Sequence, residues 1–526
     1  MTQDFFKDSK LLGIWTQISR VLGLIRDNLC GRMFGTSIEF GAFTLAFRIP
    51  DLFRRLLDEG VLTAVFTPQL VDKLEKEGQE KSLQFASSIF SMLLIILSLF
   101  CVIGIIVFAT ISQFAPISDE WKYILKYSII LIPYLVFIGL IALLGSILNA
   151  LKHFFSPAFS PILFNLIWIA GLIIAWNCYE TTNQRITLVC FFLTFSGVLQ
   201  VGLLLYVLRK YNWKIHFSFN QNSFALKNIF VKFLPAIFCL AVFQLNVLID
   251  GVLAIFLVDS KHAAAALYYS DRIQQLPFGI VAISIATATY PMLALLHSQN
   301  KKDELKQNLT TALRGVWFLT IPSCIGILFL NTSLVQQFYS FKDPESTSST
   351  AITLICFSIG LVFTCTIPLL TRVFYARGEL KTPAKIGLGI VLLNIFLCIF
   401  FLQLTNLGGA ALALATSVSS FVYAGILFYL VHKKLNLIDL TQIKSSCLKL
   451  LIPSISLIAW LVFLQHEICH QTIYNLTQYI WWFASHSSLF YLLFSVSSSI
   501  IIYMATAYFI KSSEFREIFL KKKESH

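Results

Sequence analysis

Long apolar runs recur along this 526-residue sequence and limit what it can fold into. Each is close to the roughly 20 residues that an α-helix needs to cross the hydrocarbon core of a bilayer. Charged residues make up only 13% of the chain, about half their share in a typical soluble domain. The sequence therefore predicts an all-α polytopic membrane protein. The clearest runs are residues 88–111, 127–148, 159–176, 188–208, 386–404 and 489–510.

The polar breaks between these runs predict about fourteen transmembrane helices. The first, second and eighth are the least apolar because they carry charges. The predicted segments are 11–33, 42–71, 86–112, 123–150, 157–177, 186–208, 229–257, 263–296, 310–339, 350–376, 384–403, 409–431, 447–465 and 489–510.

Lysine and arginine are distributed unevenly between the two sides of these spans. With both termini in the cytoplasm, 27 of the 40 Lys and Arg residues fall on the cytoplasmic side, 6 on the other side and 7 inside spans. Positively charged loops tend to stay cytoplasmic, so the asymmetry predicts this orientation. It also explains the net charge of +13 as an orientation signal, and no nucleic-acid partner is expected.

Motifs for catalysis or cofactor binding are missing from the sequence. The 11 cysteines lack a C-x-x-C spacing and are interpreted as small buried hydrophobes. No G-x-x-x-x-G-K-[ST] phosphate loop occurs, and no segment resembles a soluble catalytic domain. The sequence thus predicts no metal site, no nucleotide site and no enzyme activity. Because no nucleotide-binding loop occurs, any energy-driven transport by this protein is expected to use an ion gradient or the membrane potential.

Two halves of the sequence resemble each other. LNALKHFFSPA (148–158) and FYARGELKTPA (374–384) each end an apolar run, turn, and open the next run, 226 residues apart. TAVFTPQL (63–70) and TATYPMLA (287–294) form a second pair, 223 residues apart. These pairs predict a duplicated six-span unit, as in transporters with a central binding site. The predicted parts are an N-terminal six-helix lobe (1–222), a C-terminal six-helix lobe (223–440) and an extra helix pair with a basic cytoplasmic tail (441–526).

The stretch FRIPDLFRRLLDEG (47–60) places six charges and a proline in an apolar region. An arginine at mid-membrane costs about 2.5–3.5 kcal/mol on insertion scales, so it normally faces a bundle interior or a wet cavity. Its guanidinium also offers a fork of donors that matches phosphate oxygens. We therefore expect at least one of Arg26, Arg54 and Arg272 to contact an anion. The arginines inside predicted spans are Arg20, Arg26, Arg48, Arg54, Arg55, Arg272 and Arg372.

Structural ion pairs are the alternative role for these arginines. Spacings of four residues place Asp51 and Glu59 one turn to either side of Arg55 on a helix. Arg54 and Arg55 are about 100° apart around a helix and cannot face the same point. We expect the two arginines to have different roles, with Arg55 in a structural ion pair on a helix that Pro50 bends.

Five stretches of the chain carry a family pattern: RVLGLIRDNLCGRMFG (20–35), FRIPDLFRRLLDEGVLTAVFTP (47–68), LLGSILNALKHFFSPAFSPILFN (143–165), YYSDRIQQLPFGIVAISIATATYP (268–291) and FYARGELKTPAKI (374–386). They resemble the MurJ (MviN) family, the lipid II flippases of bacterial peptidoglycan synthesis in the multidrug/oligosaccharidyl-lipid/polysaccharide exporter superfamily. The resemblance implies fourteen helices in two pseudo-symmetric six-helix lobes and a C-terminal pair that forms a lipid-tail groove. It also implies a central cationic cavity and alternating access.

The resemblance implies substrate-binding roles for a set of cavity residues. The family's essential arginines fall on Arg20, Arg26, Arg54 and Arg272, with Asp27 as an acidic companion.

Other positions are implied to act in gating or in structural ion pairs. Glu59 matches the acid of the family's R-R-x-x-x-E-G pattern, and Lys381 matches the basic position of its K-T-P turn. The sequence departs from the family at Gly41, where members commonly have Asp before Ala-Phe. Glu39, two residues earlier, is the candidate substitute for that acid in the outer gate.

The implied function is to move undecaprenyl-pyrophosphate-linked disaccharide-pentapeptide from the inner to the outer leaflet of the bacterial cytoplasmic (inner) membrane. The expected partners are lipid II, membrane lipids and the cell-wall synthesis machinery, and the expected state is a monomer. The alternatives are another lipid-linked oligosaccharide flippase or an ion-coupled antiporter of the same superfamily, a glycosyltransferase, and a scaffold. A cleft that leans positive disfavours export of cationic drugs. The sequence shows no large loop with paired carboxylates for an enzyme, and a scaffold has little reason to bury arginines.

The predicted orientation can be tested with reporter fusions. Because the charge asymmetry places both termini in the cytoplasm, fusions at Asn220 and Glu524 should report the cytoplasm. Fusions at Ser260 and Ser487 should report the periplasm. A C-terminal fusion that reports the periplasm would contradict this topology.

Overall fold

The computed structural model of the chain describes residues 2–57, 66–114, 118–213, 246, 248–258, 262–466 and 487–517, without the side chains of residues 2–13, 55 and 56. Residues in these ranges form helices and turns, and none of them forms a strand. The chain divides into two compact units, Met1–Ile255 and Phe256–His526. The predicted lobe boundary at residues 222 and 223 lies outside the described residues, so the three predicted parts stay a prediction.

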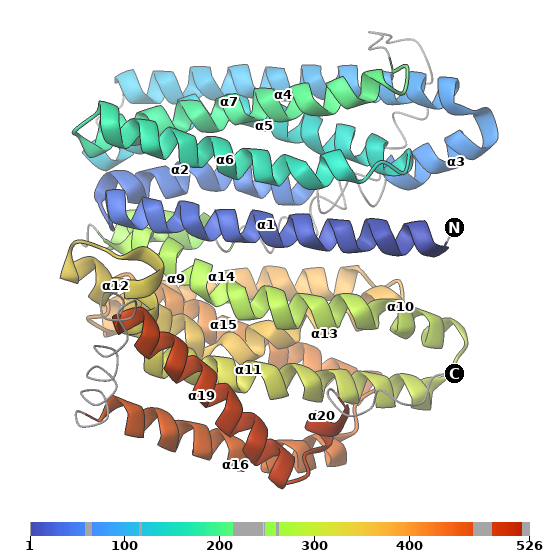
Figure 1. The fold of residues 1–526 in the computed structure, drawn as a ribbon, viewed down its shortest axis with the longest axis vertical. Helices are drawn as coiled ribbons and strands as arrows, with labels where there is room; N and C mark the ends of the chain where they lie inside the picture. The colour runs from blue at the N-terminus through green and yellow to red at the C-terminus, as the bar shows by residue number, and fades with distance from the viewer. Residues whose placement is uncertain are drawn as a thin grey trace. The chain divides into compact units, whose positions relative to one another are not determined.

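The first unit contains six long helices and the shorter helix α3 among its labelled elements (Figure 1). A further short apolar helix, Leu248–Leu257, lies near its end. The labelled helices are α1 (Thr2–Phe34), α2 (Ile38–Leu56), α3 (Thr67–Glu77), α4 (Gln79–Phe114), α5 (Asp119–Ala150), α6 (Phe155–Cys178) and α7 (Thr182–Arg209).

The second unit is also helical and includes two short π-helical segments, η2 and η3. Its elements are α9 (Ala263–Pro277), η2 (Phe278–Ile283), α10 (Ser284–Ser298), α11 (Lys302–Tyr339), α12 (Pro344–Ile359), α13 (Leu361–Ala376), α14 (Lys381–Leu404), α15 (Ala410–Tyr429), η3 (Leu430–Lys434), α16 (Leu440–Gln465), α19 (Ser487–Phe509) and α20 (Ser513–Phe515).

Ten helices in the described ranges are long and apolar enough to cross a membrane, or eleven if the bent pair α12 and α13 is one span. These eleven correspond to the predicted spans three to six and eight to fourteen. The first predicted span corresponds to α1, and the second, 42–71, covers most of α2 and the start of α3, with residues 58–65 outside the described residues. Most of the seventh also lies outside the described residues. The chain is therefore a multi-pass membrane protein, and the count of fourteen stays a prediction.

The first unit is built around α5, which packs against α2, α4 and α7. Its last turns bury four aliphatic side chains completely: Leu143, Leu144, Ile147 and Leu148. The helix α1 packs against α6. Polar residues of α1 are thereby brought next to polar residues of α6.

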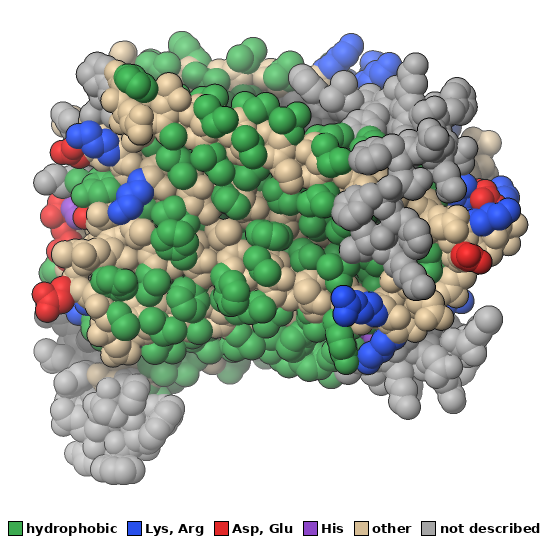
Figure 2. Space-filling model, turned by 90° about the horizontal axis from the view of Figure 1, so that it is seen from above, with side chains coloured by type: hydrophobic (Ala, Val, Ile, Leu, Met, Phe, Trp, Pro, Cys, Tyr) green, Lys and Arg blue, Asp and Glu red, His purple; other side chains and the backbone are tan. Residues whose placement is uncertain are grey.

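The outer surface of the first unit is apolar along α4. Large hydrophobic side chains there are exposed, including Leu99, Phe100, Ile103 and Ile106. In the space-filling view, hydrophobic side chains cover the middle of the visible face and charged side chains gather at its two ends (Figure 2). Such a surface would promote association in water, whereas lipid tails are a matching solvent for it.

The sequence repeat is reproduced in local geometry. The turn between α5 and α6 has Lys152 at φ 61°, and the turn between α13 and α14 has Gly378 at φ 74°, 226 positions later. In both turns the next residue donates a backbone hydrogen bond to the carbonyl five residues earlier. The helices that follow, α6 and α14, are each 24 residues long. The first of the two sequence echoes is thus also a repeat of structure.

The span formed by α12 and α13 bends by 46° at Gly360. Ser417 of α15 lies against this break, where its hydroxyl accepts from the Gly360 amide at 3.1 Å and donates to the Cys356 carbonyl at 2.6 Å. A Cβ atom on Gly360 would lie 2.6 Å from the Ser417 Cα. Glycine is therefore required here by close approach of a neighbouring backbone.

Gly360→Ala should lower the free energy of unfolding by about 1–3 kcal/mol, because the new methyl group forces α15 away from the bend. Thermal melting of the purified protein in detergent would measure the change. Gly389→Ala is the matched control, since no atom lies within 4 Å of a methyl group added at this α14 position. Equal melting temperatures for the two variants would contradict this account of the bend.

The C-terminal helices are attached to α11 by a buried ion pair. Arg314 of α11 donates from Nε to Glu514 Oε1 of α20 at 2.8 Å, and both side chains are buried. Ser446 of α16 donates to the same carboxylate oxygen at 2.6 Å, and Ser512 donates to the other at 2.5 Å. Arg314 is one of the 27 Lys and Arg residues counted on the cytoplasmic side as orientation signals, and the structure shows it as a buried link between three helices.

The pKa of Glu514 reflects these contacts. Burial opposes its charged form, yet hydrogen bonds from Ser446, Ser512, the backbone and Arg314 lower the pKa to about 2. A carboxyl group whose folded-state pKa lies below its unfolded value stabilises the fold fully above the unfolded pKa. That contribution is lost as the pH falls from the unfolded value towards about 2.

Melting temperatures measured from about pH 6 to about pH 2 should therefore fall on the acid side, and Glu514→Gln should flatten this dependence. Arg314→Ala should cost about 3–5 kcal/mol near neutral pH, because it leaves a buried carboxylate without its cation. Glu304→Gln, which breaks an exposed pair with Lys301, is the control and should cost about 0–1 kcal/mol. An acid-side slope that is unchanged in Glu514→Gln would refute this role.

Candidate functional site

Arg26 and Asp27 form a buried ion pair on α1. The guanidinium donates from Nε and Nη2 to the same Asp27 oxygen, Oδ1, at 2.9 and 2.7 Å. Arg26 is only 7% exposed, and so is Asp27. A buried charge is tolerated when it is paired and hydrogen-bonded, and the adjacent carboxylate supplies the first of these partners.

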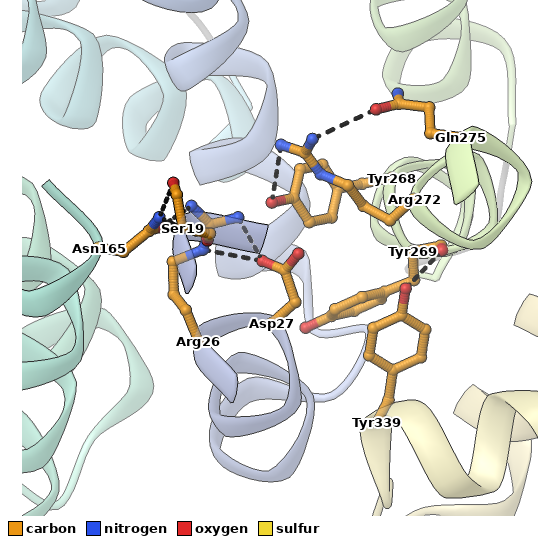
Figure 3. Close-up of polar contacts among 9 residues, drawn as sticks. All are labelled: Ser19, Arg26, Asp27, Asn165, Tyr268, Tyr269, Arg272, Gln275 and Tyr339. Atoms are coloured by element: carbon orange, nitrogen blue, oxygen red, sulfur yellow. Dashed lines mark hydrogen bonds and ion pairs between the residues drawn. The ribbon is translucent and has the colours of Figure 1, made fainter. Parts of the chain in front are cut away.

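Two residues of α6 also contact Arg26. Its Nη1 donates to Asn165 Oδ1 at 2.9 Å, and its guanidinium carbon lies 4.2 Å from the centre of the Trp168 ring. The Asn165 amide nitrogen in turn donates to the carbonyl oxygen of Ser19 on α1 at 3.2 Å (Figure 3). Sequence reasoning missed both α6 residues. The available signal was a polar asparagine within an otherwise apolar span.

Arg54 lies on α2 and pairs with Asp51, one turn earlier. Its Nη2 is 3.0 Å from Asp51 Oδ1, and its side chain is 44% exposed. Sequence reasoning did not predict this pair, and the predicted contact of Asp51 with Arg55 stays a prediction. The Arg55 side chain and Glu59 lie outside the described residues, so their predicted ion pair stays a prediction.

The remaining predicted site residues of the first unit are less enclosed. Arg20 is exposed on α1, six residues before Arg26. Glu39 is half-buried in the first turn of α2, where an acidic side chain favours the helix N-terminus. Gly41 is buried in the following turn.

In the second unit, Arg272 is half-buried on α9. Its Nη2 lies 3.5 Å from the Tyr268 hydroxyl and its Nη1 lies 3.4 Å from Gln275 Oε1 (Figure 3). The guanidinium also lies 5.1 Å from the centre of the Tyr268 ring. These contacts are long and are made to uncharged groups, whereas the neighbouring Asp271 accepts from Gln275 at 2.7 Å. Lys381, also predicted for the site, is exposed at the first position of α14.

An apolar groove of about 450 Å³ also lies in the second unit. It is bounded by α9, η2, α11, α16 and α19. One side of the groove is formed by η2, which begins directly after Pro277. Proline has no amide hydrogen and so cannot donate the backbone hydrogen bond of a regular α-helix. Almost all the lining side chains are hydrophobic, among them Pro277, Ile280, Leu319, Pro322, Leu457 and Ile500.

His262, Asp343 and Glu345 come together where α12 begins, with possible ligand atoms within 4.8 Å of one another. Asp343 already accepts the backbone amides of Glu345 and Ser346 as the N-cap of α12. Both carboxylates are exposed. We interpret the group as a helix cap beside a His262–Glu345 contact of 3.4 Å, and the absence of a metal site stays a prediction.

Comparison with known sequences identifies relatives along most of the chain. The family described as "Lipid II flippase MurJ" matches residues 30–483. The "Probable lipid II flippase MurJ" of Buchnera aphidicola subsp. Baizongia pistaciae (strain Bp) is 32% identical over 435 residues, which cover 81% of this chain and 82% of that protein. The "Probable lipid II flippase MurJ" of Rickettsia prowazekii (strain Madrid E) is 29% identical over 454 residues, covering 85% and 88%.

Solved structures agree with these sequence matches. The structure described as "Lipid II flippase MurJ, inward closed conformation" has a TM-score of 0.77 and 25% identity, covering 95% of this chain and 99% of that one. An inward-facing multidrug resistance MATE family transporter of the MOP superfamily has a TM-score of 0.66 at 14% identity, covering 80% and 94%. The second likeness concerns the fold alone.

Proposed function

This chain belongs to the lipid II flippase MurJ family, and we propose that it moves lipid II from the inner to the outer leaflet of the bacterial cytoplasmic membrane. The family match over residues 30–483 is the observation that carries the proposal. A family named for moving a lipid is a family of transporters, so the protein is a transporter and not an enzyme.

The proposed site for the lipid II diphosphate consists of arginines inside the membrane-embedded helices. Arg54 is the most exposed of the described pair-forming arginines and has one edge engaged by Asp51. The contacts of Arg272 with Gln275 and Tyr268, at 3.4 and 3.5 Å, are ones that compete weakly with an anionic ligand. Arg20 and Arg26, with Asp27, are the further members of this proposed site.

The proposed site for the polyprenyl tail is the apolar groove of the second unit. Its lining offers few hydrogen-bonding groups, so an isoprenoid chain bound there would bury apolar surface and cover few polar groups of the protein. The C-terminal helices α16 and α19 supply one side of it, and the Arg314–Glu514 pair links these helices to α11. This arrangement supports a role for the C-terminal pair in substrate binding.

The finer features of the mechanism are also proposals. They comprise fourteen helices in two six-helix lobes, a central cationic cavity, alternating access, cytoplasmic termini and a monomeric state. We propose an ion gradient or the membrane potential as the energy source, without a cofactor, and contact with the cell-wall synthesis machinery. Glu39, Asp51, Arg55, Glu59 and Lys381 are proposed to act in gating or structural ion pairs.

Arg272→Ala should abolish lipid II transport while the protein accumulates normally, because the half-buried side chain contributes little packing. Complementation of a strain depleted of its flippase, with leaflet-resolved labelling of lipid II, would measure it. Arg185→Ala is the control, since this half-buried arginine stacks on Trp176 outside the proposed site and the variant should transport at the wild-type rate. Wild-type transport by both Arg272→Ala and Arg272→Lys would overturn the role of Arg272 in diphosphate binding.

A further inference from the structure

The Arg26 guanidinium is held from two directions by α6. Asn165 takes the Nη1 corner at 2.9 Å, and the Trp168 ring covers the planar face at 4.2 Å. The edge formed by Nε and Nη2 remains for Asp27, which accepts both donors through Oδ1. This edge presents two parallel N–H groups, the arrangement that binds carboxylate and phosphate oxygens most tightly. The α6 contacts leave it to an acceptor.

Asn165 is fixed in one orientation. Its amide nitrogen donates to the Ser19 carbonyl oxygen at 3.2 Å and lies 3.3 Å from the Ser19 hydroxyl. A carbonyl oxygen can only accept, so the amide nitrogen must face Ser19 and the amide oxygen must face Arg26. Asn165 is therefore an oriented acceptor for Arg26.

Trp168 is fixed as firmly by aromatic packing. Its ring is 1% exposed and makes edge-on contacts with Phe43, Phe47 and Phe164, at centroid distances of 5.9, 5.2 and 5.4 Å. Its indole Nε1 is buried without an acceptor among the described residues, a cost that phenylalanine would avoid. The benefit of tryptophan here lies in its ring face, which attracts a cation more strongly than that of phenylalanine.

We infer that Asn165 and Trp168 are positioning residues that orient the Arg26 guanidinium, so that its Nε and Nη2 edge can pass from Asp27 to a phosphate of the substrate. This inference rests on the proposed function. A free arginine side chain loses rotamer freedom when it binds an anion, and a side chain already fixed by its neighbours avoids that loss. The diphosphate then competes with Asp27 for the prepared edge.

The test is a double-mutant cycle on binding. Wild-type protein, Asn165→Ala, Arg26→Ala and the double variant are purified, and their affinities for undecaprenyl pyrophosphate and for the uncharged alcohol undecaprenol are measured. Asn165→Ala should weaken diphosphate binding about tenfold, the effect of losing one hydrogen bond to a charged group. It should leave undecaprenol binding unchanged. In the Arg26→Ala background it should add nothing, because its effect acts through Arg26.

Two further sets of variants separate positioning from general stability. Trp168→Phe keeps an aromatic ring with a weaker cation–π attraction, and Trp168→Leu removes the ring. Diphosphate affinity should therefore fall from wild type to Trp168→Phe to Trp168→Leu. Ser160→Ala removes another buried hydrogen bond of α6, the one to Gln200 at 2.9 Å, and should bind both lipids as the wild type does.

Additive effects of Asn165→Ala and Arg26→Ala, or an equal loss of undecaprenol binding, would overturn the inference in favour of a purely structural role. Equal diphosphate binding by wild type and Arg26→Ala would also overturn it, while the proposed function would still stand on the Arg272 transport test. A wild-type protein that neither binds undecaprenyl pyrophosphate nor transports lipid II would overturn both.

Discussion

A guanidinium inside an apolar helical bundle must keep its charge paired, and several tertiary contacts of this protein meet that requirement. Arg26 is enclosed by a carboxylate, an amide and an aromatic ring, which together join α1 to α6. Arg314 of α11 pairs with Glu514 of α20, and the Ser446 hydroxyl of α16 donates to the same carboxylate, so these contacts join the three helices. Losing one member of such a group costs more than losing a surface ion pair, because the remaining charge stays buried.

The backbone obeys the same rule where helices are interrupted. At the bend between α12 and α13, the freed carbonyl groups find side-chain donors: Ser417 for Cys356, Gln274 for Phe357 and Cys324 for Ser358. Near the apolar groove, the helix after Pro277 continues as a π segment. Irregular backbone at membrane depth is tolerated when neighbouring side chains satisfy it. The second unit thus combines a bent span with an apolar groove without leaving these carbonyl groups unpaired.

Much of the helical framework could be predicted from the sequence because the determining signals are local. Apolar runs of membrane length predicted eleven of the spans that the structure describes. The basic turns around Lys152 and Gly378 are a repeat in the sequence, and they share their backbone geometry. Arg26, Arg54 and Arg272 could likewise be chosen as candidate anion-binding residues from the sequence. Each lies inside a predicted span, where an arginine is energetically costly.

The sequence by itself determined that the chain is a bundle of membrane-length helices with buried arginines, because hydropathy and charge are properties of each segment. Only the tertiary structure decided which partner each arginine meets. Asn165 is 139 positions from Arg26, and Glu514 is 200 positions from Arg314. On α2, side-chain geometry brought Arg54 within 3.0 Å of Asp51, a pair that spacing alone did not single out. Such partners depend on which helix faces pack together, and the apolar residues of one helix face do not specify which other helix will pack against it.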